Sequence, residues 1–438
     1  MKPALAREPR RNRRRSHCGL ASLILLVGQV ILFAAENPVD RPPPAFSTWV
    51  PPALPAPPAN GPALCQGNFL KPEEGKATLA YLLTLCTNRS SWEAYADTVR
   101  RGILRGAGLV PLPRRTPLDP VVRNRRAHDG YSVENVAFES IPGFYVTGNL
   151  YRPLNGKGPF PAMLSTHGHS RITGIDSSPL FSAGLQQRCA TLARMGVVVF
   201  SIDMFAYGES LLQVPAEAHQ SLAAMRLQLW DNIRAIDFLL SLPEADPARV
   251  GVSGESGGGT QTFLLAAVDT RITLSVPVVM VSSYFFGGCA CESGRPIHRT
   301  SEYFADNAEI AALAAPRPML VVSDGKDWTR NVPEVEYPFL QRVYSFYGCT
   351  DNVVNVHLGA EGHDYGPSKR AAMYRFVAER FRLNLAAVQD AEGKIDESRV
   401  AVETPAALRF FEDGSTLPAN ALHGVDAIET QLQKLQER

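Results

Sequence analysis

Short apolar runs alternate with stretches of helical periodicity along most of this chain. Nearly continuous hydrophobic runs occupy 161–166, 197–202, 249–253, 274–281, 319–322 and 353–358. Such runs are typical of strands that are buried on both faces of a sheet. Between the second and third runs, apolar residues recur at helical spacing over 222–240. Strands that alternate with helices predict an α/β fold with a mostly parallel central sheet and helices on both faces.

Other patterns flank this predicted core. Residues 132–138 and 144–151 alternate apolar and polar positions across a turn near Pro142 and Gly143, which predicts a β-hairpin at the sheet edge. Upstream, apolar residues recur at helical spacing over 72–106, with a break and cap at 88–91. We therefore expect a helical N-terminal extension at 72–130, an α/β domain at 131–385 and a C-terminal extension at 386–438.

The first 71 residues have a different composition. Basic side chains crowd the first 15 residues, and an apolar run follows at 19–35. This order predicts an export signal at 1–35, which would serve as a membrane tether if it were retained. Ten of the 25 residues from 38 to 62 are proline, so we expect an extended Pro-rich tether over 36–71. The predicted location is outside the cytoplasm: periplasmic, extracellular or membrane-anchored.

Composition excludes some partners. The chain has 438 residues, of which 45% are hydrophobic, and this is enough for one large domain with additions. Its formal net charge is +1, so no overall field attracts nucleic acid, and we expect no nucleic-acid partner. Of the seven cysteines, Cys18 lies in the predicted signal. The other six allow many disulfide pairings, among which the sequence does not choose.

The segment Gly254-Glu255-Ser256-Gly257-Gly258 carries the clearest chemical signal. It follows a β-prone run and precedes a helix-like stretch at 260–268. A G-x-S-x-G pattern between strand and helix is typical of a nucleophile elbow, in which a sharp turn raises the serine hydroxyl above the sheet. Small residues two positions before and after the serine avoid steric clashes in that turn. Ser256 is therefore the candidate nucleophile.

A serine nucleophile needs a base, and the base needs an acid that orients it. His363 lies on a glycine-flanked loop after the last apolar run and is the candidate base, whereas His357 lies inside that run and is expected to be structural. Asp324 and Asp327 both follow the preceding run. We expect Asp327 to be the acid because it lies further from the strand, and Asp324 remains the alternative.

The negative charge that develops on a carbonyl oxygen during acyl transfer needs two N–H donors. We expect one from Gly257, directly after the nucleophile, and one from His169, in the loop after the run at 161–166. His167 and His169 have no third metal ligand at a recognisable spacing, and Cys289 and Cys291 have no second cysteine pair. The sequence therefore predicts no metal site and no cofactor.

With these motifs, residues 131–385 resemble the α/β-hydrolase superfamily. Within it, the chain looks most similar to acetyl xylan esterases, dienelactone hydrolases and prolyl oligopeptidase-type serine hydrolases. The similarity lies in the motif around Ser256, in Ser165-Thr166-His167-Gly168-His169 and in Ser201-Ile202-Asp203. The resemblance implies a Ser256–His363–Asp327 triad, an acyl-enzyme mechanism and a structural role for Asp203.

The connection at 282–308 is long for a link between two strands of such a sheet. Insertions at this edge of α/β sheets shape substrate pockets. We expect the connection to line the pocket through Phe285 and Phe286. Glu292, Arg295 and His298 are candidate substrate contacts in this connection, although charged residues of this kind are more typical of a surface loop.

Three functions follow from these patterns. The favoured one is an exported serine hydrolase that cleaves carboxylic esters, similar to acetyl xylan esterases, with a small-molecule or polysaccharide ester as its partner. The second is a peptidase of the prolyl oligopeptidase type, but such enzymes usually carry a β-propeller, for which the preceding residues leave too little room. The third is a non-catalytic binding protein on a hydrolase fold, which would often have lost one of the three candidate catalytic residues.

Overall fold

The structure is a computed structural model that describes residues 70–300, 302–411 and 417–437. These residues belong to one compact unit. The predicted export signal at 1–35 and nearly all of the predicted tether at 36–71 lie outside the described residues. Within the described ranges, no helix is both long enough and apolar enough to cross a membrane.

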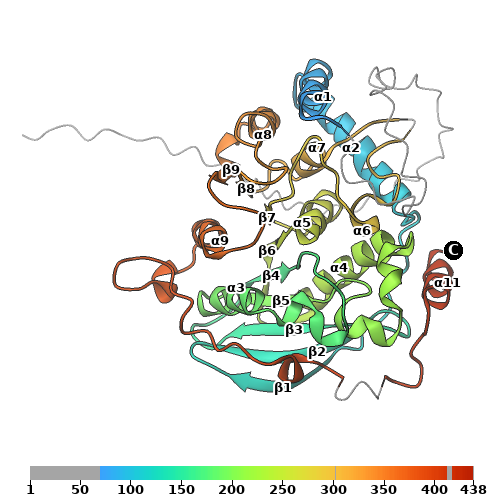
Figure 1. Cartoon of the computed structure of the whole chain (residues 1–438), viewed down its shortest axis with the longest axis vertical. Coiled ribbons are helices and arrows are strands. Elements are labelled where there is room, and N and C mark those ends of the chain that lie inside the picture. Colours follow the sequence, from blue (N-terminus) through green and yellow to red (C-terminus); the bar gives the residue numbers. More distant parts are fainter. Residues whose placement is uncertain (1–69, 301, 412–416, 438) are drawn as a thin grey trace, which may run out of the picture. The chain divides into compact units, whose positions relative to one another are not determined.

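A nine-stranded sheet forms the centre of the molecule, in the order β1-β2-β3-β5-β4-β6-β7-β8-β9 (Figure 1). The six strands from β5 to β9 in this order are parallel, and β1, β2 and β3 join them as an antiparallel meander. The strands are β1 (Val121–Ala127), β2 (Tyr131–Ile141), β3 (Phe144–Pro153), β4 (Phe160–Ser165), β5 (Val198–Ile202), β6 (Ala245–Glu255), β7 (Leu274–Val278), β8 (Met319–Asp324) and β9 (Val353–Leu358). The predicted mostly parallel sheet is confirmed.

Helices cover both faces of this sheet, as Figure 1 shows for α3 and α9 on one side and α4 and α5 on the other. Each buried strand therefore supplies side chains to two cores, which explains its continuous apolar run. The helices are α1 (Pro72–Leu85), α2 (Arg89–Gly106), α3 (Ala183–Arg194), α4 (Ala223–Ser241), α5 (Gly257–Val268), α6 (Ala290–Ser293), α7 (Asn307–Ala312), α8 (Glu336–Ser345), α9 (Pro367–Phe381), α10 (Pro405–Leu408) and α11 (Val425–Gln436). In β8, for example, Val321 packs on the α4 and α5 side, while Leu320 and Val322 pack on the α3 and α9 side.

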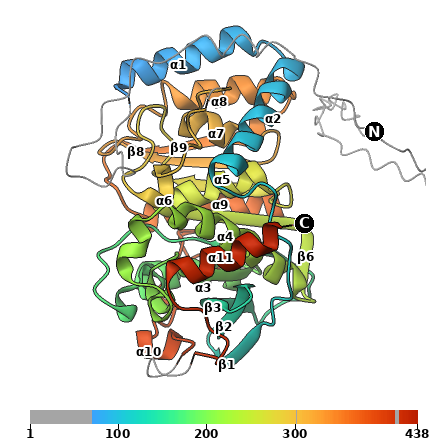
Figure 2. The ribbon, with the colours of Figure 1, turned by 90° about the vertical axis from the view of Figure 1, so that its right-hand side faces the viewer.

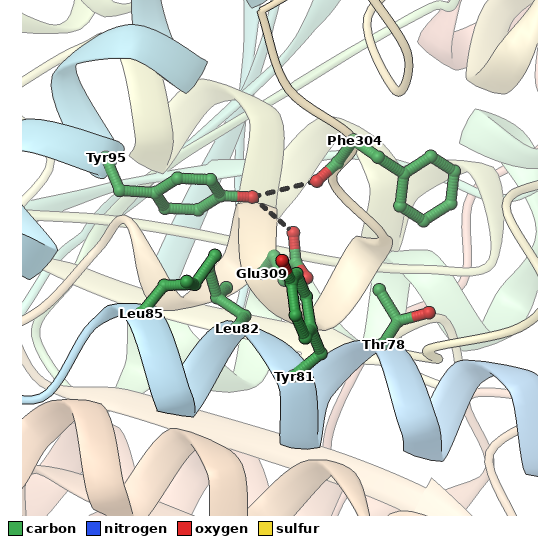
Figure 3. A pocket seen from close by; sticks show the side chains of 7 residues that line it. All are labelled: Thr78, Tyr81, Leu82, Leu85, Tyr95, Phe304 and Glu309. Carbon is green, nitrogen blue, oxygen red and sulfur yellow. Dashed lines mark hydrogen bonds between the residues drawn. The ribbon is translucent and has the colours of Figure 1, made fainter. Parts of the chain in front are cut away.

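The N-terminal helices pack against the end of the domain that carries α7 and α8 (Figure 2). Asn88 caps α2, because its side chain accepts a hydrogen bond from the Ser91 N–H. Figure 3 shows how α2 is joined to α7: the Tyr95 hydroxyl lies 2.6 Å from Glu309 Oε2 and 2.9 Å from the Phe304 carbonyl oxygen. Burial, together with the nearby Asp306 carboxylate, raises the pKa of Glu309 well above its usual range.

One segment differs from the sequence prediction. The segment predicted as a helical extension at 72–130 also contains β1, which pairs with β2, so the β2–β3 hairpin is not at the edge of the sheet. The C-terminal segment at 386–438 packs on the α/β domain. The Phe410 and Phe411 N–H groups donate to the buried Glu209 carboxylate, and α11 lies across α4 (Figure 2), where Arg226 and Glu429 form an ion pair at 3.1 Å.

Asp231 makes the stability of this fold depend on pH. Its side chain is buried on α4, and burial raises its pKa to about 7. The pKa of Asp231 in the folded protein lies above its value in the unfolded chain. Its contribution to the free energy of unfolding is therefore fully present below about pH 4 and is lost as the pH rises through 7. We expect Asp231→Asn to raise the free energy of unfolding by about 1–3 kcal/mol at pH 8 and to change it little at pH 4.

Urea denaturation at the two pH values measures this difference. The matched control is Asp97→Asn, because the Asp97 side chain is 62% exposed on α2. An Asp231→Asn effect of the same size at pH 4 and pH 8 would contradict the assignment of a raised pKa.

Candidate active site

Ser256 sits at the sharp turn between β6 and α5. Its backbone has φ 55° and ψ −121°, a conformation that residues other than glycine rarely adopt. A Cβ atom on Gly254 would lie 2.1 Å from Thr166 Oγ1, and one on Gly258 would lie 2.8 Å from the His167 carbonyl oxygen. Both positions therefore require glycine, and the G-x-S-x-G pattern forms the strained turn that the sequence predicts.

His363 and Asp327 come from the loops after β9 and β8 and meet at the same edge of the sheet. The His363 Nδ1 atom lies 2.6 Å from Asp327 Oδ2. The Asp327 side chain is 3% exposed, whereas that of His363 is 32% exposed. Ser256 and His363 line the same cavity of about 550 Å³. The structure thus brings the three candidate catalytic residues to one site.

The two rival residues occupy structural positions. Asp324 ends β8, and its carboxylate accepts hydrogen bonds from the N–H groups of Lys326 and Asp327, at 3.0 and 3.1 Å. Burial and the neighbouring Asp327 carboxylate raise the pKa of Asp324. His357 lies within β9, where its Nδ1 atom is 2.9 Å from Ser323 Oγ. Asp324 therefore forms the turn that presents Asp327.

The loop after β4 lies directly against the nucleophile turn. A Cβ atom on Gly257 would be 2.4 Å from His169 Cε1, and one on Gly168 would be 3.0 Å from the Glu255 carbonyl oxygen. The two predicted oxyanion donors, Gly257 and His169, are therefore neighbours across this contact. Their assignment as donors stays a prediction.

An ion pair that the sequence analysis missed holds this loop in place. The Glu255 carboxylate accepts a hydrogen bond from the Gly168 N–H at 3.1 Å, and its other oxygen lies 2.6 Å from Arg188 Nη1. Arg188 also donates to the Thr166 carbonyl oxygen at 2.7 Å. Glu255 occupies the variable position of G-x-S-x-G, so the pattern gave no signal for it, and Arg188 comes from α3, far away in the sequence.

Buried His167 and Asp203 help to hold the loop after β4 in place. Burial lowers the pKa of His167 to about 4, which keeps the ring neutral, and its Nε2 atom accepts a hydrogen bond from the Met204 N–H at 3.1 Å. Burial raises the pKa of Asp203 to about 7. Asp203 accepts hydrogen bonds from the Ser178 hydroxyl and from the Glu209 N–H. These contacts fit the structural role that the resemblance implies for Asp203.

A second lobe of the site, of about 340 Å³, also reaches Ser256. Phe285 and Trp328 line it, and their rings stack with centroids 3.9 Å apart. Phe286 was predicted to line the pocket too, and this is wrong. Its side chain is 1% exposed and stacks on His298. Of the two phenylalanines, Phe285 therefore faces the site and Phe286 packs into the interior.

The connection at 282–308 is not a charged surface loop. Glu292 is 3% exposed and lines the second lobe, and His298 is 6% exposed and packs under Phe286. The connection also brings two cysteines toward histidines from elsewhere in the chain. One ligand atom from each of four residues lies within 4.8 Å of the others: His169, His219, Cys289 and Cys291. Such a set can hold a metal ion.

Comparison with known proteins identifies the family of this chain. The methylesterase BT1017 is 41% identical in sequence; the match covers 84% of this chain and 81% of that one, with a TM-score of 0.76. The chain belongs to the α/β-hydrolase esterases. More distant relatives are YtaP of Bacillus subtilis (strain 168), assigned as a hydrolase, and a 4-O-methyl-glucuronoyl methylesterase of Neurospora crassa.

Each of these two is 24% identical to the chain. The match to YtaP covers 62% of this chain and 93% of that protein, and the match to the Neurospora enzyme covers 57% and 68%. No family model matches the chain. The predicted fold class and membership of the α/β-hydrolase superfamily are confirmed, and the esterase relatives support an ester hydrolase.

Proposed function

We propose that this protein is a serine carboxylic-ester hydrolase in which Ser256, His363 and Asp327 form the catalytic triad. The observation that carries the proposal is the 2.6 Å contact between His363 Nδ1 and Asp327 at a cavity that Ser256 also lines. In such a contact Nδ1 keeps its proton, so Nε2 is available as a base for the serine hydroxyl. This contact favours an enzyme over a non-catalytic binding protein.

The mechanism follows from these positions. Ser256 Oγ attacks the ester carbonyl carbon while His363 takes its proton, and the N–H groups of Gly257 and His169 stabilise the oxyanion. The bond from the acyl carbon to the alcohol oxygen then breaks, and His363 returns the proton to the leaving alcohol. Water attacks the acyl-enzyme in the same manner, which releases the acid and restores Ser256. The Asp327 carboxylate, in contact with His363 Nδ1, stabilises the imidazolium.

We favour a methyl ester of a carbohydrate acid as the substrate. The relative with 41% identity is a methylesterase, and the Neurospora relative is a 4-O-methyl-glucuronoyl methylesterase. In such a substrate the large part lies on the acyl side and the leaving group is methanol. An acetyl ester, the choice favoured by sequence resemblance, reverses this arrangement. The two lobes at Ser256, of about 550 and 340 Å³, give room for a bulky acyl group.

A panel of substrates separates these functions. It contains methyl-esterified polyuronates, methyl glucuronate, acetylated xylan, p-nitrophenyl acetate and prolyl nitroanilides. Methanol, acetate and nitroaniline are measured separately, with Ser256→Ala as the blank. We expect methanol release to be fastest. Fastest acetate release would identify an acetyl esterase, fastest nitroaniline release a peptidase, and no Ser256-dependent release a binding protein.

Phe285 is expected to set the range of acyl groups that the site accepts. Replacing it with alanine removes the ring that stacks on Trp328. The Trp328 and His363 rings in turn lie with their centroids 4.5 Å apart. We expect Phe285→Ala to change the relative kcat/KM values across the ester panel by about tenfold. The matched control is Phe286→Ala, which should cost about 3–5 kcal/mol of stability without changing the substrate profile. An unchanged profile in folded Phe285→Ala would remove this residue from the substrate site.

We further propose that the enzyme acts outside the cytoplasm, through the basic and apolar pattern at 1–35. Cell fractionation of the full chain and of a chain lacking these residues tests the proposal. Export of both forms, or of neither, would contradict it.

A further inference from the structure

Two histidine rings and two cysteine side chains from separate segments converge beside Ser256. His169 lies on the loop after β4, and His219 lies on the short helix Ala216–Gln220. Cys289 caps α6 and Cys291 lies in its first turn. His219, Cys289 and Cys291 are buried, with exposures of 2%, 4% and 1%. This set, here called the His–Cys cluster, forms part of the wall of the smaller lobe through His169 and Cys289.

The spacing of the cluster suits a small tetrahedral metal ion. The His169 Nε2 atom lies 3.1 Å from His219 Nε2 and 3.0 Å from Cys291 Sγ, and all four ligand atoms lie within 4.8 Å of one another. Around a tetrahedral zinc ion, ligand atoms are separated by about 3.3 Å for two nitrogens, about 3.6 Å for nitrogen and sulfur and about 3.8 Å for two sulfurs. The four atoms therefore surround a space of about that size.

The His219 ring is held in the form that a metal ligand requires. Its Nδ1 atom lies 2.7 Å from the Phe205 carbonyl oxygen. A carbonyl oxygen only accepts hydrogen bonds, so Nδ1 carries the proton, and the lone pair of Nε2 faces the cluster. Metal-ligating histidines commonly donate their other ring N–H to a carbonyl or carboxylate in this manner.

We propose that the His–Cys cluster is a zinc site with two histidine nitrogens and two cysteine thiolates as ligands. Two imidazoles with two thiolates are a common donor set for structural zinc. A bound ion would join the loop that carries His169, the helix that carries His219 and the connection at 282–308. It would thus fix one wall of the site. This binding differs from the metal-free prediction made from sequence spacing, and it is independent of the proposed triad.

Metal binding is tested first on the full wild-type chain, so the result does not depend on the folding of a variant. The protein is kept reduced with a phosphine, stripped with a chelator and titrated with Co²⁺. We expect one Co²⁺ per chain, with the intense visible bands of tetrahedral cobalt, a near-ultraviolet thiolate-to-cobalt band and loss of both when Zn²⁺ is added. Elemental analysis of unstripped protein is expected to give about one zinc per chain.

Variants locate the site. Cys291→Ser and His219→Ala are expected to lose the cobalt bands, whereas Cys189→Ser, which alters a buried cysteine of α3 outside the cluster, is expected to keep them. Ser256→Ala is also expected to keep them, so failure of the proposed catalytic function and failure of the metal site are distinguishable. A bound ion would also position the loop that carries His169 at the proposed catalytic site. This effect rests on the proposed function, and it predicts that stripped protein loses kcat and regains it with Zn²⁺.

Three results would overturn the proposal. The first is reduced wild-type protein that gives no tetrahedral cobalt spectrum. The second is a cobalt spectrum that survives unchanged in Cys291→Ser. The third is a mass two units lower in the unreduced chain together with a peptide that links Cys289 or Cys291 to another cysteine, which would assign the sulfurs to a disulfide.

Discussion

Replacing Ser256 with alanine is expected to lower ester hydrolysis at least about a thousandfold and to leave the melting temperature close to that of the wild type. The substitution removes the only atom that forms the acyl-enzyme, so the covalent route is lost and only binding and oxyanion stabilisation remain. Stability should change little, because the φ of 55° already strains this position and alanine adds no new atoms. The measurement is initial rate on the best ester of the panel, together with thermal unfolding.

A matched control uses another serine of the same cavity. Ser170 lines both lobes of the site, and its hydroxyl lies 3.3 Å from the Ser177 carbonyl oxygen. Ser170→Ala should therefore keep more than about a tenth of the wild-type activity. Near-normal turnover by folded Ser256→Ala would place the nucleophile elsewhere.

Replacing Asp327 with asparagine is expected to lower kcat by about a thousandfold to ten-thousandfold. The amide has the same shape, but it neither fixes the proton on His363 Nδ1 nor stabilises the imidazolium that forms when His363 takes the serine proton. The loss should appear mainly in kcat, and KM should change little, because the Asp327 side chain is only 3% exposed and it is His363 that lines the cavity at Ser256. The measurement is a pair of full kinetic curves on the same ester.

Asp324→Asn provides the contrast. Asp324 accepts the Lys326 and Asp327 N–H groups, and an asparagine oxygen still accepts them. We expect at most about a tenfold loss in kcat, with some loss of stability. If Asp324→Asn proves far more damaging to kcat than Asp327→Asn, the two carboxylates have been assigned in the wrong order.

The sheet was predictable from sequence where both of its faces are buried. Strands such as β4 and β8 supply side chains to two cores, so each carries a continuous apolar run, and this pattern is local. The edge strand β1 was missed because its side chains are almost all exposed, which leaves no hydrophobic alternation to detect. The packing of 386–438 was missed for another reason: it depends on contacts with distant residues, such as Glu209 beneath Phe410 and Phe411.

The candidate catalytic residues were predictable because parallel strands end at one edge of a sheet. A residue that directly follows a buried strand must lie at that edge, so Ser256, Asp327 and His363 could be brought together without coordinates. The turn at Ser256 is also recognisable from sequence, because its G-x-S-x-G pattern is contiguous, although the contacts that require Gly254 and Gly258 come from the distant loop at Thr166 and His167. Sequence thus determines the fold class and the glycine-flanked turn at Ser256, and it selects His363 as the candidate base.

Only the tertiary structure decides which neighbours these residues have. Asp327 reaches His363 because Asp324 turns the chain, and the choice between Phe285 and Phe286 depends on which of the two side chains packs into the interior. Arg188 reaches Glu255, and His219 reaches His169, across 67 and 50 residues. Contacts between residues so far apart leave no recognisable motif spacing in the sequence. Packing of the sheet and its helices, rather than local structure, brings these partners together.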